Sequence, residues 1–290
     1  MQAVPPSPRP VARRDDPQVV WLGPRSFHGQ SPDTFPDGEF PGQEAVFTLP
    51  DTQVPMTLCW CPPSTKGDVP GFWIAKHPVS QRQWSAVMGS NPSKASHGED
   101  LPVDSVSWKD AQEFCRNTFL RLPSEAEWEH ACRAGTSTDY AIGVGTAIHS
   151  QIANFNGNDP EGGTPHGFKW LYRERTTPEG SFPPNAWGLH DMHGQLWEWC
   201  EDETEWGRGI RGGGWNSLGS GAAAGLRFLP EARPSFLSKK IYPSLRVSRV
   251  GFRPCPCSRI PGKDDGKGKK AASAAGPGGK GWSPADGPAK

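Results

Sequence analysis

Three short amphipathic helices are the regular elements that the sequence predicts most clearly. Each follows a serine whose hydroxyl can accept a hydrogen bond from a backbone amide of the first turn, namely Ser80, Ser107 and Ser124. Ser80 with Gln83, and Ser124 with Glu127, also have the spacing of a capping box. Apolar residues that recur at i, i+3 and i+4 then give each helix one face to bury. They are Trp84, Val87 and Met88, then Ala111, Phe114 and Cys115, then Trp128, Ala131 and Cys132.

The rest of the folded chain is expected to consist of short strands set in long loops. Patterns typical of strands cover 56–61, 71–75, 208–215 and 249–255. The chain has 35 glycines and 32 prolines, which favour turns and loops. Its 13 tryptophans and 13 phenylalanines supply the large side chains of a core. We therefore predict the α+β class with little regular secondary structure, in which the long loops are functional or held by specific contacts.

Composition divides the chain into three parts. Residues 1–44 are Pro-rich and weakly hydrophobic, which predicts a mostly disordered N-terminal segment. Residues 45–258 are expected to form the folded domain. Residues 259–290 are rich in Gly, Ala and Lys, which predicts a flexible, mildly basic tail.

Charge and hydropathy argue against two broad classes of function. Lys and Arg together number 31, as do Asp and Glu, so the formal net charge is zero. This argues against a general electrostatic role on nucleic acid, except for a weak contact through the basic tail. No apolar stretch resembles a signal peptide or a membrane span, so we expect a cytoplasmic protein without membrane contact. The seven cysteines are an odd number, which fits reduced thiols better than a complete disulfide framework.

Four motifs occur in an order that resembles the formylglycine-generating enzyme, or sulfatase-modifying factor, family. The resemblance covers roughly residues 55–255 and includes weaker landmarks at 78–81 and 102–108. The four motifs are 121–129 (RLPSEAEWE), 185–192 (NAWGLHDM) continuing through Gly194, Trp197, Glu198 and Trp199, 211–215 (RGGGW), and 251–253 (GFR).

The resemblance implies a C-type-lectin-like fold, in which the first and last strands pair and loops build a concave surface. Most residues of the motifs are expected to hold the fold, because large buried Trp side chains usually do so. Arg211 and Arg253 can each bind loop carbonyls, or a carboxylate such as Glu198, with the planar fork of a guanidinium.

The copper chemistry of the family is not expected here. In formylglycine-generating enzymes, two cysteines five residues apart follow the RGG-aromatic motif and bind copper to oxidise a substrate cysteine. The resemblance places Ser217 and Ala222 at about these positions, and no cysteine lies between Cys200 and Cys255. A hydroxyl and a methyl group cannot replace two thiolates as soft ligands of Cu(I). We therefore expect neither bound copper nor formylglycine-generating oxidase activity.

A second branch of the family makes carbon–sulfur bonds with non-haem iron held mainly by a preceding helical domain. Before Met56 the chain is Pro-rich and contains His28 as its only histidine. The later histidines show no spacing typical of metal ligands, so structural or surface roles are favoured for them. A metal-dependent oxidoreductase of the non-haem iron type, with ligands that the sequence does not reveal or that a partner supplies, remains the alternative function.

Two other metal sites are considered. The resemblance implies structural calcium, with Asn154 and Glu198 at ligand positions, while Gln195 stands where the family usually has Asn. Separately, Cys59 and Cys61 share one face of the first predicted strand, and Cys255 and Cys257 lie on or just past the last one.

If those two strands pair, four thiols converge into a zinc site or a pair of disulfides. Four unlinked thiols are the favoured alternative, because two C-x-C pairs are weaker evidence for zinc than two C-x-x-C pairs.

The favoured function is a non-catalytic module that binds an unknown protein or small-molecule ligand through residues 216–250. Little regular pattern occurs there, and the mixture of aromatic, basic and small polar side chains suits adaptable recognition. In relatives of this fold, diversity-generating retroelements rewrite the ligand-binding surface in this interval. A third interpretation is a degenerate relative that binds a maturase's substrate without modifying it. The candidate ligand-binding residues are Asn216, Ser217, Leu218, Phe228, Phe236, Lys239, Tyr242, Leu245, Arg246 and Ser248.

Overall fold

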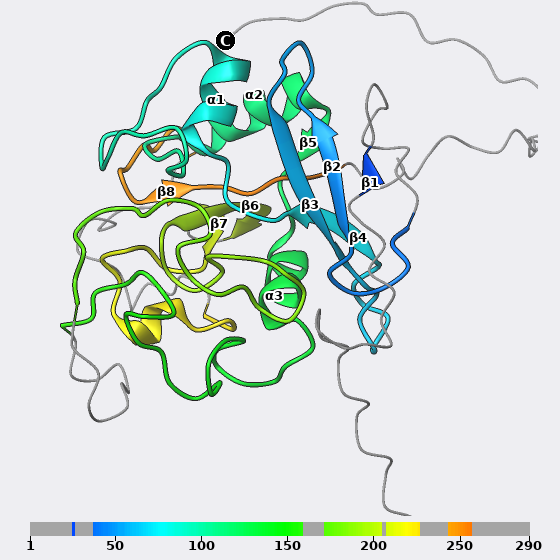
Figure 1. Cartoon of the computed structure of the whole chain (residues 1–290), viewed down its shortest axis with the longest axis vertical. Coiled ribbons are helices and arrows are strands. Elements are labelled where there is room, and N and C mark those ends of the chain that lie inside the picture. The colour runs from blue at the N-terminus through cyan, green and yellow to red at the C-terminus, as the bar shows by residue number, and fades with distance from the viewer. Residues whose placement is uncertain (1–24, 27–36, 159–170, 205–206, 227–242, 257–290) are drawn as a thin grey trace, which may run out of the picture. The chain divides into compact units, whose positions relative to one another are not determined.

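The computed structural model describes residues 25–26, 37–158, 171–204, 207–226 and 243–256 (Figure 1). The helices are α1 (Gln81–Met88), α2 (Trp108–Thr118), α3 (Glu125–Arg133) and the short 3₁₀ helix η2 (Gly219–Ala222). The strands are β1 (Arg25–Ser26), β2 (Glu44–Thr48), β3 (Pro55–Cys61), β4 (Phe72–Ala75), β5 (Leu120–Arg121), β6 (Trp197–Thr204), β7 (Gly207–Arg211), β8 (Val250–Gly251) and β9 (Cys255–Pro256). The predicted α+β class, with few helices and long loops, is confirmed.

All three predicted helices are confirmed, and their caps explain where they begin. Ser80 and Ser124 each form the expected capping box, with Gln83 and Glu127 respectively. Ser107 forms a third capping box with Asp110, whose carboxylate accepts from the Ser107 amide at 2.7 Å. Each cap satisfies amides that the first helical turn leaves without partners, which is why such short helices persist.

The predicted strands are only partly confirmed. The strands predicted at 56–61, 71–75 and 208–215 correspond to β3, β4 and β7, although β7 ends at Arg211. The segment 249–255 holds two separate short strands, β8 and β9. The sequence did not predict β1, β2, β5 or β6. Arg25–Ser26 and residues 37–44, which belong to the predicted N-terminal segment, are among the described residues.

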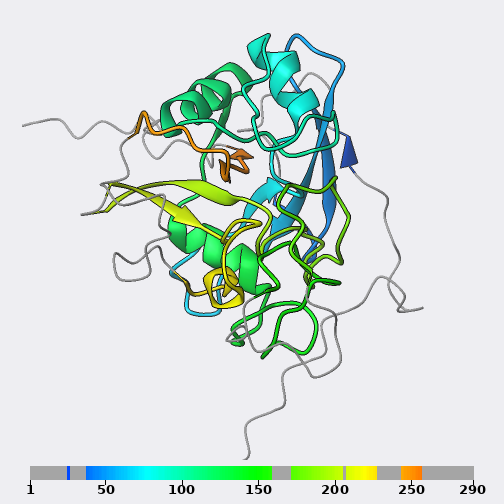
Figure 2. The ribbon, with the colours of Figure 1, turned by 90° about the vertical axis from the view of Figure 1, so that its left-hand side faces the viewer.

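Within the described residues, the strands form three small sheets. The first has the order β1-β2-β3-β4, the second pairs β5 with β9, and the third has the order β7-β6-β8. The expected pairing between the first and last predicted strands is wrong. Strand β3 pairs with β2 and β4, whereas β9 pairs antiparallel with β5, where Arg121 lies opposite Cys255. The β6–β7 hairpin lies between α2 and α3 (Figures 1 and 2).

Two large apolar clusters hold these sheets and helices together. One contains side chains from β2, β3, β4, α1, α2 and β6, including the stacked rings of Trp84 and Phe114 at 5.7 Å. The other joins α3 to β3, β4 and the loop at 187–192, with Trp128 fully buried. Burying large aromatic side chains on this scale supplies the main stabilisation of a domain that has so little regular structure.

Arg211 and Arg253 fasten the loops to this core, as the sequence predicted. Both are fully buried. Arg253 donates to both carboxylate oxygens of Glu198, at 2.7 and 2.8 Å, and to the carbonyl of His190 at 2.8 Å. Arg211 lies within 2.5 Å of the Glu129 carboxylate and donates to the carbonyl of Leu226 at 2.8 Å. These paired cations fix the ends of the segment that contains the candidate ligand-binding residues.

No helix in the described part of the chain is long and apolar enough to cross a membrane.

Candidate ligand-binding surface

The segment after β7 forms two successive turns that bring residue 218 to the surface. The amide of Gly214 donates to the hydroxyl of Ser217 at 2.9 Å, and the amide of Ser217 donates to the carbonyl of Gly214 at 2.8 Å. Gly213 has φ = 75°, and a Cβ there would lie 2.6 Å from the carbonyl oxygen of Gly221, so no other residue fits without a shift. Leu218 follows this turn and leaves 46% of its surface exposed.

The segment 243–250 is held against the start of α2. The carbonyl of Pro243 accepts from the amide of Lys109 at 3.1 Å, and the carbonyl of Val247 accepts from the amide of Ser105 at 3.2 Å. Arg246 makes two hydrogen bonds to Asp110, at 2.6 and 2.8 Å. Asp110 therefore serves both as part of the α2 cap and as the carboxylate that holds Arg246.

The structure divides the described candidate residues into two groups. Asn216, Ser217 and Leu218 lie together at the turn after β7. Leu245 packs against the larger apolar cluster, Arg246 is bound to Asp110, and Ser248 is half-buried. A ligand-binding role for these three residues stays a prediction. The remaining candidates lie outside the described residues; they are Phe228, Phe236, Lys239 and Tyr242.

Sequence reasoning missed an aromatic stack beside Asn216. The Tyr172 and Trp215 rings are stacked with centroids 6.0 Å apart, and the guanidinium carbon of Arg249 lies 5.2 Å from the centroid of Trp215. Trp215 was assigned to the framework because it belongs to the RGGGW motif. Tyr172 comes from a loop more than 40 residues away, and no spacing rule joins it to Trp215.

The positions at which the resemblance places the copper ligands have structural roles. Ser217 closes the turn described above, and Ala222 is fully buried. The carbonyl of Ala222 accepts from His193 Nδ1 at 2.7 Å, while His193 Nε2 accepts from the amide of Ala141 at 3.0 Å. Burial lowers the pKa of His193 to about 4, so this ring is neutral and both of its nitrogens are engaged.

Glu198 is held by residues of the framework. Its Oε1 accepts from Arg253, and its Oε2 accepts from Arg253 and from Trp128 Nε1, each at 2.7 or 2.8 Å. The positive charge that balances this carboxylate is therefore a guanidinium. A role of Glu198 as a calcium ligand stays a prediction.

Asn154 keeps one feature of a cation ligand. Its Nδ2 donates to the carbonyl of Arg175 at 2.9 Å and to Gln195 Oε1 at 2.7 Å, while its Oδ1 is buried without a hydrogen-bond partner. The Gln195 amide is fully used, because it also exchanges hydrogen bonds with Thr177. A free carbonyl-type oxygen suits calcium, but among the described residues no group of three or more His, Cys, Asp or Glu side chains is placed to hold a metal.

Three of the four cysteines considered for zinc are buried. Cys59, Cys61 and Cys255 lie in the same apolar cluster, together with Cys132 and Cys200. Burial raises the pKa of the Cys61 thiol, and the neighbouring Cys59 and Cys255 raise it further. The described thiols alone assemble no metal site. Cys257 lies outside the described residues, so a site that includes it stays a prediction.

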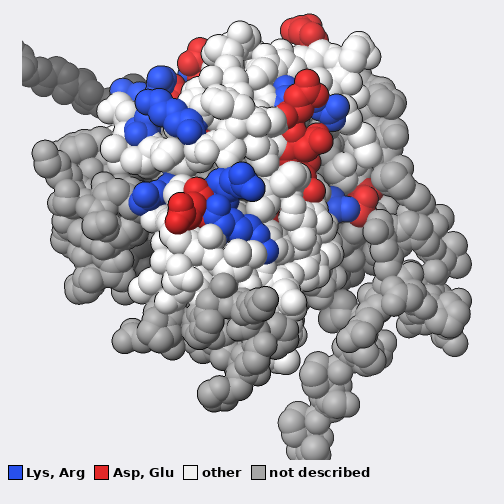
Figure 3. All heavy atoms as spheres, turned by 60° about the vertical axis from the view of Figure 1, so that its left-hand side comes forward, with Lys and Arg blue, Asp and Glu red and all other residues white. Residues whose placement is uncertain are grey.

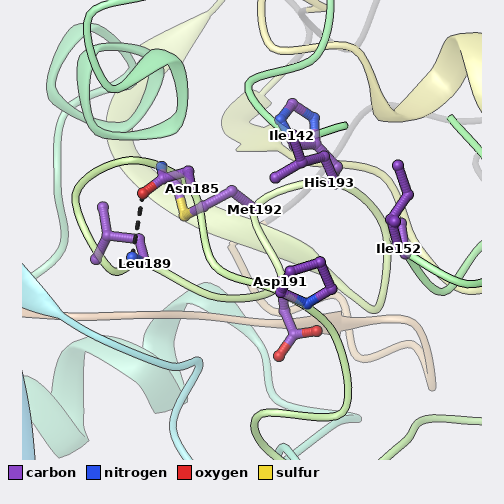
Figure 4. A pocket seen from close by; sticks show the side chains of 9 residues that line it. Ile142, Ile152, Asn185, Leu189, Asp191, Met192 and His193 are labelled. Atoms are coloured by element: carbon purple, nitrogen blue, oxygen red, sulfur yellow. Dashed lines mark hydrogen bonds between the residues drawn. The ribbon is translucent and has the colours of Figure 1, made fainter. Parts of the chain in front are cut away.

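Two acids, the buried Asp191 and the half-buried Glu179, have strongly raised pKa values. Burial raises the pKa of Asp191 to about 7 and that of Glu179 to about 7. One carboxylate oxygen in each has no hydrogen-bond partner. Asp191 also borders a small cavity of about 10 Å³, which is room for about one water molecule. Asn185, whose Oδ1 accepts from the Leu189 amide, lines the same cavity (Figure 4). The cavity has no room for an organic substrate.

The described part of the chain consists of short capped helices and small sheets that buried arginine–carboxylate pairs hold together. Such a scaffold can carry functional sites on its long loops. Residues 9–255 match the sulfatase-modifying factor enzyme 1-like domain, and the chain belongs to this family. The family predicted from the four motifs is therefore confirmed.

Several characterised proteins are similar in sequence. The chaperone protein LppX of Paenibacillus barcinonensis is 29% identical over 197 residues, which cover 50% of this chain and 70% of that protein. The formylglycine-generating enzyme of Mycobacterium tuberculosis is 31% identical over 170 residues, which cover 57% of this chain and 53% of that enzyme. The inactive C-alpha-formylglycine-generating enzyme 2 of Bos taurus is 31% identical over 159 residues, covering 52% of this chain and 50% of that protein. The chain thus spans about half the length of these last two relatives.

Two solved structures share the fold. Treponema denticola variable protein 1 superposes with a TM-score of 0.56 at 22% identity, covering 73% of this chain and 99% of that one. PvdO from Pseudomonas aeruginosa superposes with a TM-score of 0.53 at 20% identity, covering 75% of this chain and 99% of that one. These likenesses confirm the predicted C-type-lectin-like fold of the formylglycine-generating type.

Proposed function

We propose that this chain is a ligand- or protein-binding module on a formylglycine-generating-enzyme-like scaffold that lacks the copper-binding cysteine pair. Its ligand-binding surface lies within residues 216–250, and it is of the kind that a diversity-generating retroelement can vary. The observation that carries the proposal is a contrast in burial within one short segment. Arg211 is fully buried and Trp215 is 8% exposed, whereas Leu218, three residues further on, is 46% exposed. A rigid base that presents a solvent-facing turn is what a recognition surface requires.

The chemistry of Ser217 and Ala222 supports the same proposal. Neither side chain can act as a soft ligand for copper, and both are packed into the structure of the turn. His193, the histidine that lies against Ala222, uses both ring nitrogens in hydrogen bonds to the backbone. The described part of this segment thus offers shape and contact area rather than a reacting group.

The first test separates a binding module from a metal-dependent oxidoreductase. Protein purified without a metal-binding tag is analysed for copper, iron, zinc and calcium, and oxygen uptake is measured with a cysteine-containing peptide after incubation with Cu(I) or Fe(II). We expect neither stoichiometric copper or iron nor oxygen uptake above that of a heat-denatured sample. Stoichiometric copper or iron, together with peptide-dependent oxygen uptake, would establish the oxidoreductase in place of the binding module.

The second test asks whether the surface contacts a partner. A photo-reactive amino acid is placed at Leu218 or, as a matched control, at Lys66, which is exposed in the turn between β3 and β4. After irradiation in the producing cells, a discrete cross-linked adduct is expected from position 218 alone. Equal adducts from both positions, or none from either, would contradict a binding role for this surface.

A further inference from the structure

Three segments that are distant in sequence form one continuous surface around Trp215. Its centre is the Tyr172–Trp215 stack with Arg249 over Trp215, and Asn216 and the exposed Leu171 and Leu218 lie next to or near these rings in the sequence. We call it the Trp215 surface; it consists of Leu171, Tyr172, Trp215, Asn216, Leu218 and Arg249.

Backbone contacts hold these segments together. The amide of Asn156 donates to the carbonyl of Ser217 at 2.9 Å, which joins the loop at 153–158 to the turn after β7. On its other side, this loop touches the segment that carries Tyr172. A Cβ added to Gly157 would lie 2.7 Å from the carbonyl oxygen of Leu171, so only glycine allows the two backbones to approach this closely. The geometry of the surface is therefore fixed by the backbone and not by flexible side chains.

The surface combines apolar area with positive charge. Leu171 and Leu218 are each 46% exposed, although leucine is most often found buried. Arg249 lies over Trp215 and close to Tyr172, where its charge partly offsets the rise in the tyrosine pKa that burial causes. Apolar contact area beside a cation–π pair is the composition typical of protein-binding surfaces, in which aromatic residues and Arg are enriched.

Two polar atoms at the edge of this surface have no partner. Trp215 Nε1 is a donor and Asn216 Oδ1 is an acceptor; both are shielded from solvent and neither makes a hydrogen bond. Each such atom destabilises the folded chain while it stays unpaired. A peptide group carries one acceptor and one donor, so a polypeptide can satisfy both atoms once neighbouring side chains turn aside.

We propose that the Trp215 surface binds a segment of another polypeptide in which an aliphatic or aromatic side chain lies next to a carboxylate. The apolar side chain contacts the exposed Leu171 and Leu218, the carboxylate faces Arg249, and the backbone pairs with the Trp215 and Asn216 side chains. This proposal rests on the proposed binding function and identifies the class of its ligand.

Other ligand classes fit these observations less well. A sugar is recognised mainly through its hydroxyl groups, whereas the flanks of this surface are leucine side chains without polar atoms. Nucleic acid binding requires a continuous positive field, but the formal net charge is zero and the face shown in Figure 3 carries basic and acidic groups near one another with uncharged surface between them. An apolar and acidic peptide is therefore the favoured ligand.

The test selects ligands from a random pool, so the natural partner need not be identified first. Phage that display random peptides of about twelve residues, long enough to span such a surface, are selected on the immobilised full chain. Enriched peptides are then synthesised, and their affinity is measured by fluorescence anisotropy for the wild type and for the Leu171→Asp and Leu218→Asp variants. Phe119→Asp is the matched control, because Phe119 is an exposed apolar residue (58%) at the far end of α2 and its left-handed φ of 57° suits Asp.

We expect the enriched peptides to share an acidic residue beside an apolar one. Their affinity should fall at least about tenfold for Leu171→Asp and Leu218→Asp, which corresponds to about 1.4 kcal/mol, and should be unchanged for Phe119→Asp. Circular dichroism and the unfolding midpoint verify that each variant is folded. A variant that does not fold is replaced by Leu171→Ser or Leu218→Ser, which remove the same apolar contact without adding charge.

Two outcomes would overturn the proposal. The first is that no peptide is enriched. The second is that enriched peptides bind the two leucine variants as well as they bind the wild type. Parallel binding measurements with a glycan array and a single-stranded oligonucleotide show whether another ligand class depends on the same leucines. If one does, the binding function stands and the polypeptide proposal fails, whereas failure of the binding function itself would appear as metal-dependent oxygen uptake.

Discussion

Replacing Asp191 by asparagine removes one titrating group and leaves the shape of the side chain almost unchanged. Asp191 is 9% exposed, and its Oδ1 has no hydrogen-bond partner. Burial raises its pKa from 3.8 to about 7; Arg253 opposes this rise, while Glu198 and Glu179 add to it. Because the folded-state pKa exceeds the unfolded-state value, the folded protein holds this proton more tightly. Stability from this group is fully present below about pH 4 and is lost as the pH rises through about 7.

The size of the effect follows from the pKa difference. A shift of roughly 3 pKa units, at 1.36 kcal/mol per unit, corresponds to about 4 kcal/mol of unfolding free energy between about pH 4 and pH 8. At the acidic end, neutral Asp191 and Asn are nearly equivalent. At the basic end, the wild type keeps a buried carboxylate and the Asn variant does not. The unfolding free energy of Asp191→Asn, minus that of the wild type, should therefore increase by up to about 4 kcal/mol over this range.

Urea unfolding followed by tryptophan fluorescence at several pH values measures this difference. Other groups titrate as well, and those whose folded-state pKa is lowered, such as His77 (about 3) and His193 (about 4), have the opposite sign. Their contributions largely cancel when the variant is subtracted from the wild type. Asp51→Asn is the control, because Asp51 is exposed and has the same backbone φ of 58° as Asp191. A difference that stays constant with pH, or that decreases as the pH rises, would refute the reasoning.

Three further predictions test the framework and the calcium expectation. Glu198→Gln should lower the unfolding free energy, measured in urea, by about 3 kcal/mol or more, because it leaves the fully buried Arg253 without a counter-charge. An unchanged unfolding free energy would contradict the role of this ion pair in the framework. Arg246→Ala should lower the unfolding free energy by no more than about 1 kcal/mol, because its ion pair with Asp110 is largely exposed. Asp110→Ala should lower it by about 1 kcal/mol more, because this change also removes a cap of α2. Equal losses of stability in thermal unfolding would argue against the capping role of Asp110. Calcium at about 100 times its dissociation constant should stabilise the folded wild type by about 2.7 kcal/mol and so raise its melting temperature. Asn154→Ala should abolish this rise. If calcium does not raise the melting temperature of the wild type, the site is excluded.

The sequence predicted the helices well because their signals are local. A serine, an acidic or amide residue three positions later, and an apolar stripe all fall within one short segment. Ser107 shows the limit of this reasoning, because its partner Asp110 had the spacing of a capping box without the Glu or Gln that the pattern usually requires. Even so, the position of each helix was determined by residues close together in the chain.

The strands were harder to predict because their partners are distant. Strand β6 pairs antiparallel with β7 and parallel with β8, so Trp197 lies opposite Val250, more than 50 residues away. Its first half is buried on both faces and its second half alternates, so no single period describes it. Likewise, β9 pairs with β5 by two residue pairs only, too few to leave a recognisable pattern.

The candidate surface was only partly predictable, for the same physical reason. The sequence indicated the interval 216–250 from its position between two framework motifs, and Leu218 is exposed there. However, Tyr172 reaches Trp215 only through the folded loops, and Gly157 gives no sign in the sequence that it lies against Leu171. Contacts of this kind depend on the whole fold and not on local spacing.

Under the proposed function, one segment serves both as framework and as recognition surface. Arg211 anchors the start of the interval to α3, and Arg253 anchors the chain beyond its end to β6, so both ends are fixed by buried ion pairs. Leu245 packs on the core from within the interval, and a change there would disturb the fold itself. Leu218 packs on no core cluster, so side chains of different size and charge can replace it at little cost to stability. If the proposed function holds, recognition can vary at the turn after β7 while the anchored residues around it stay the same.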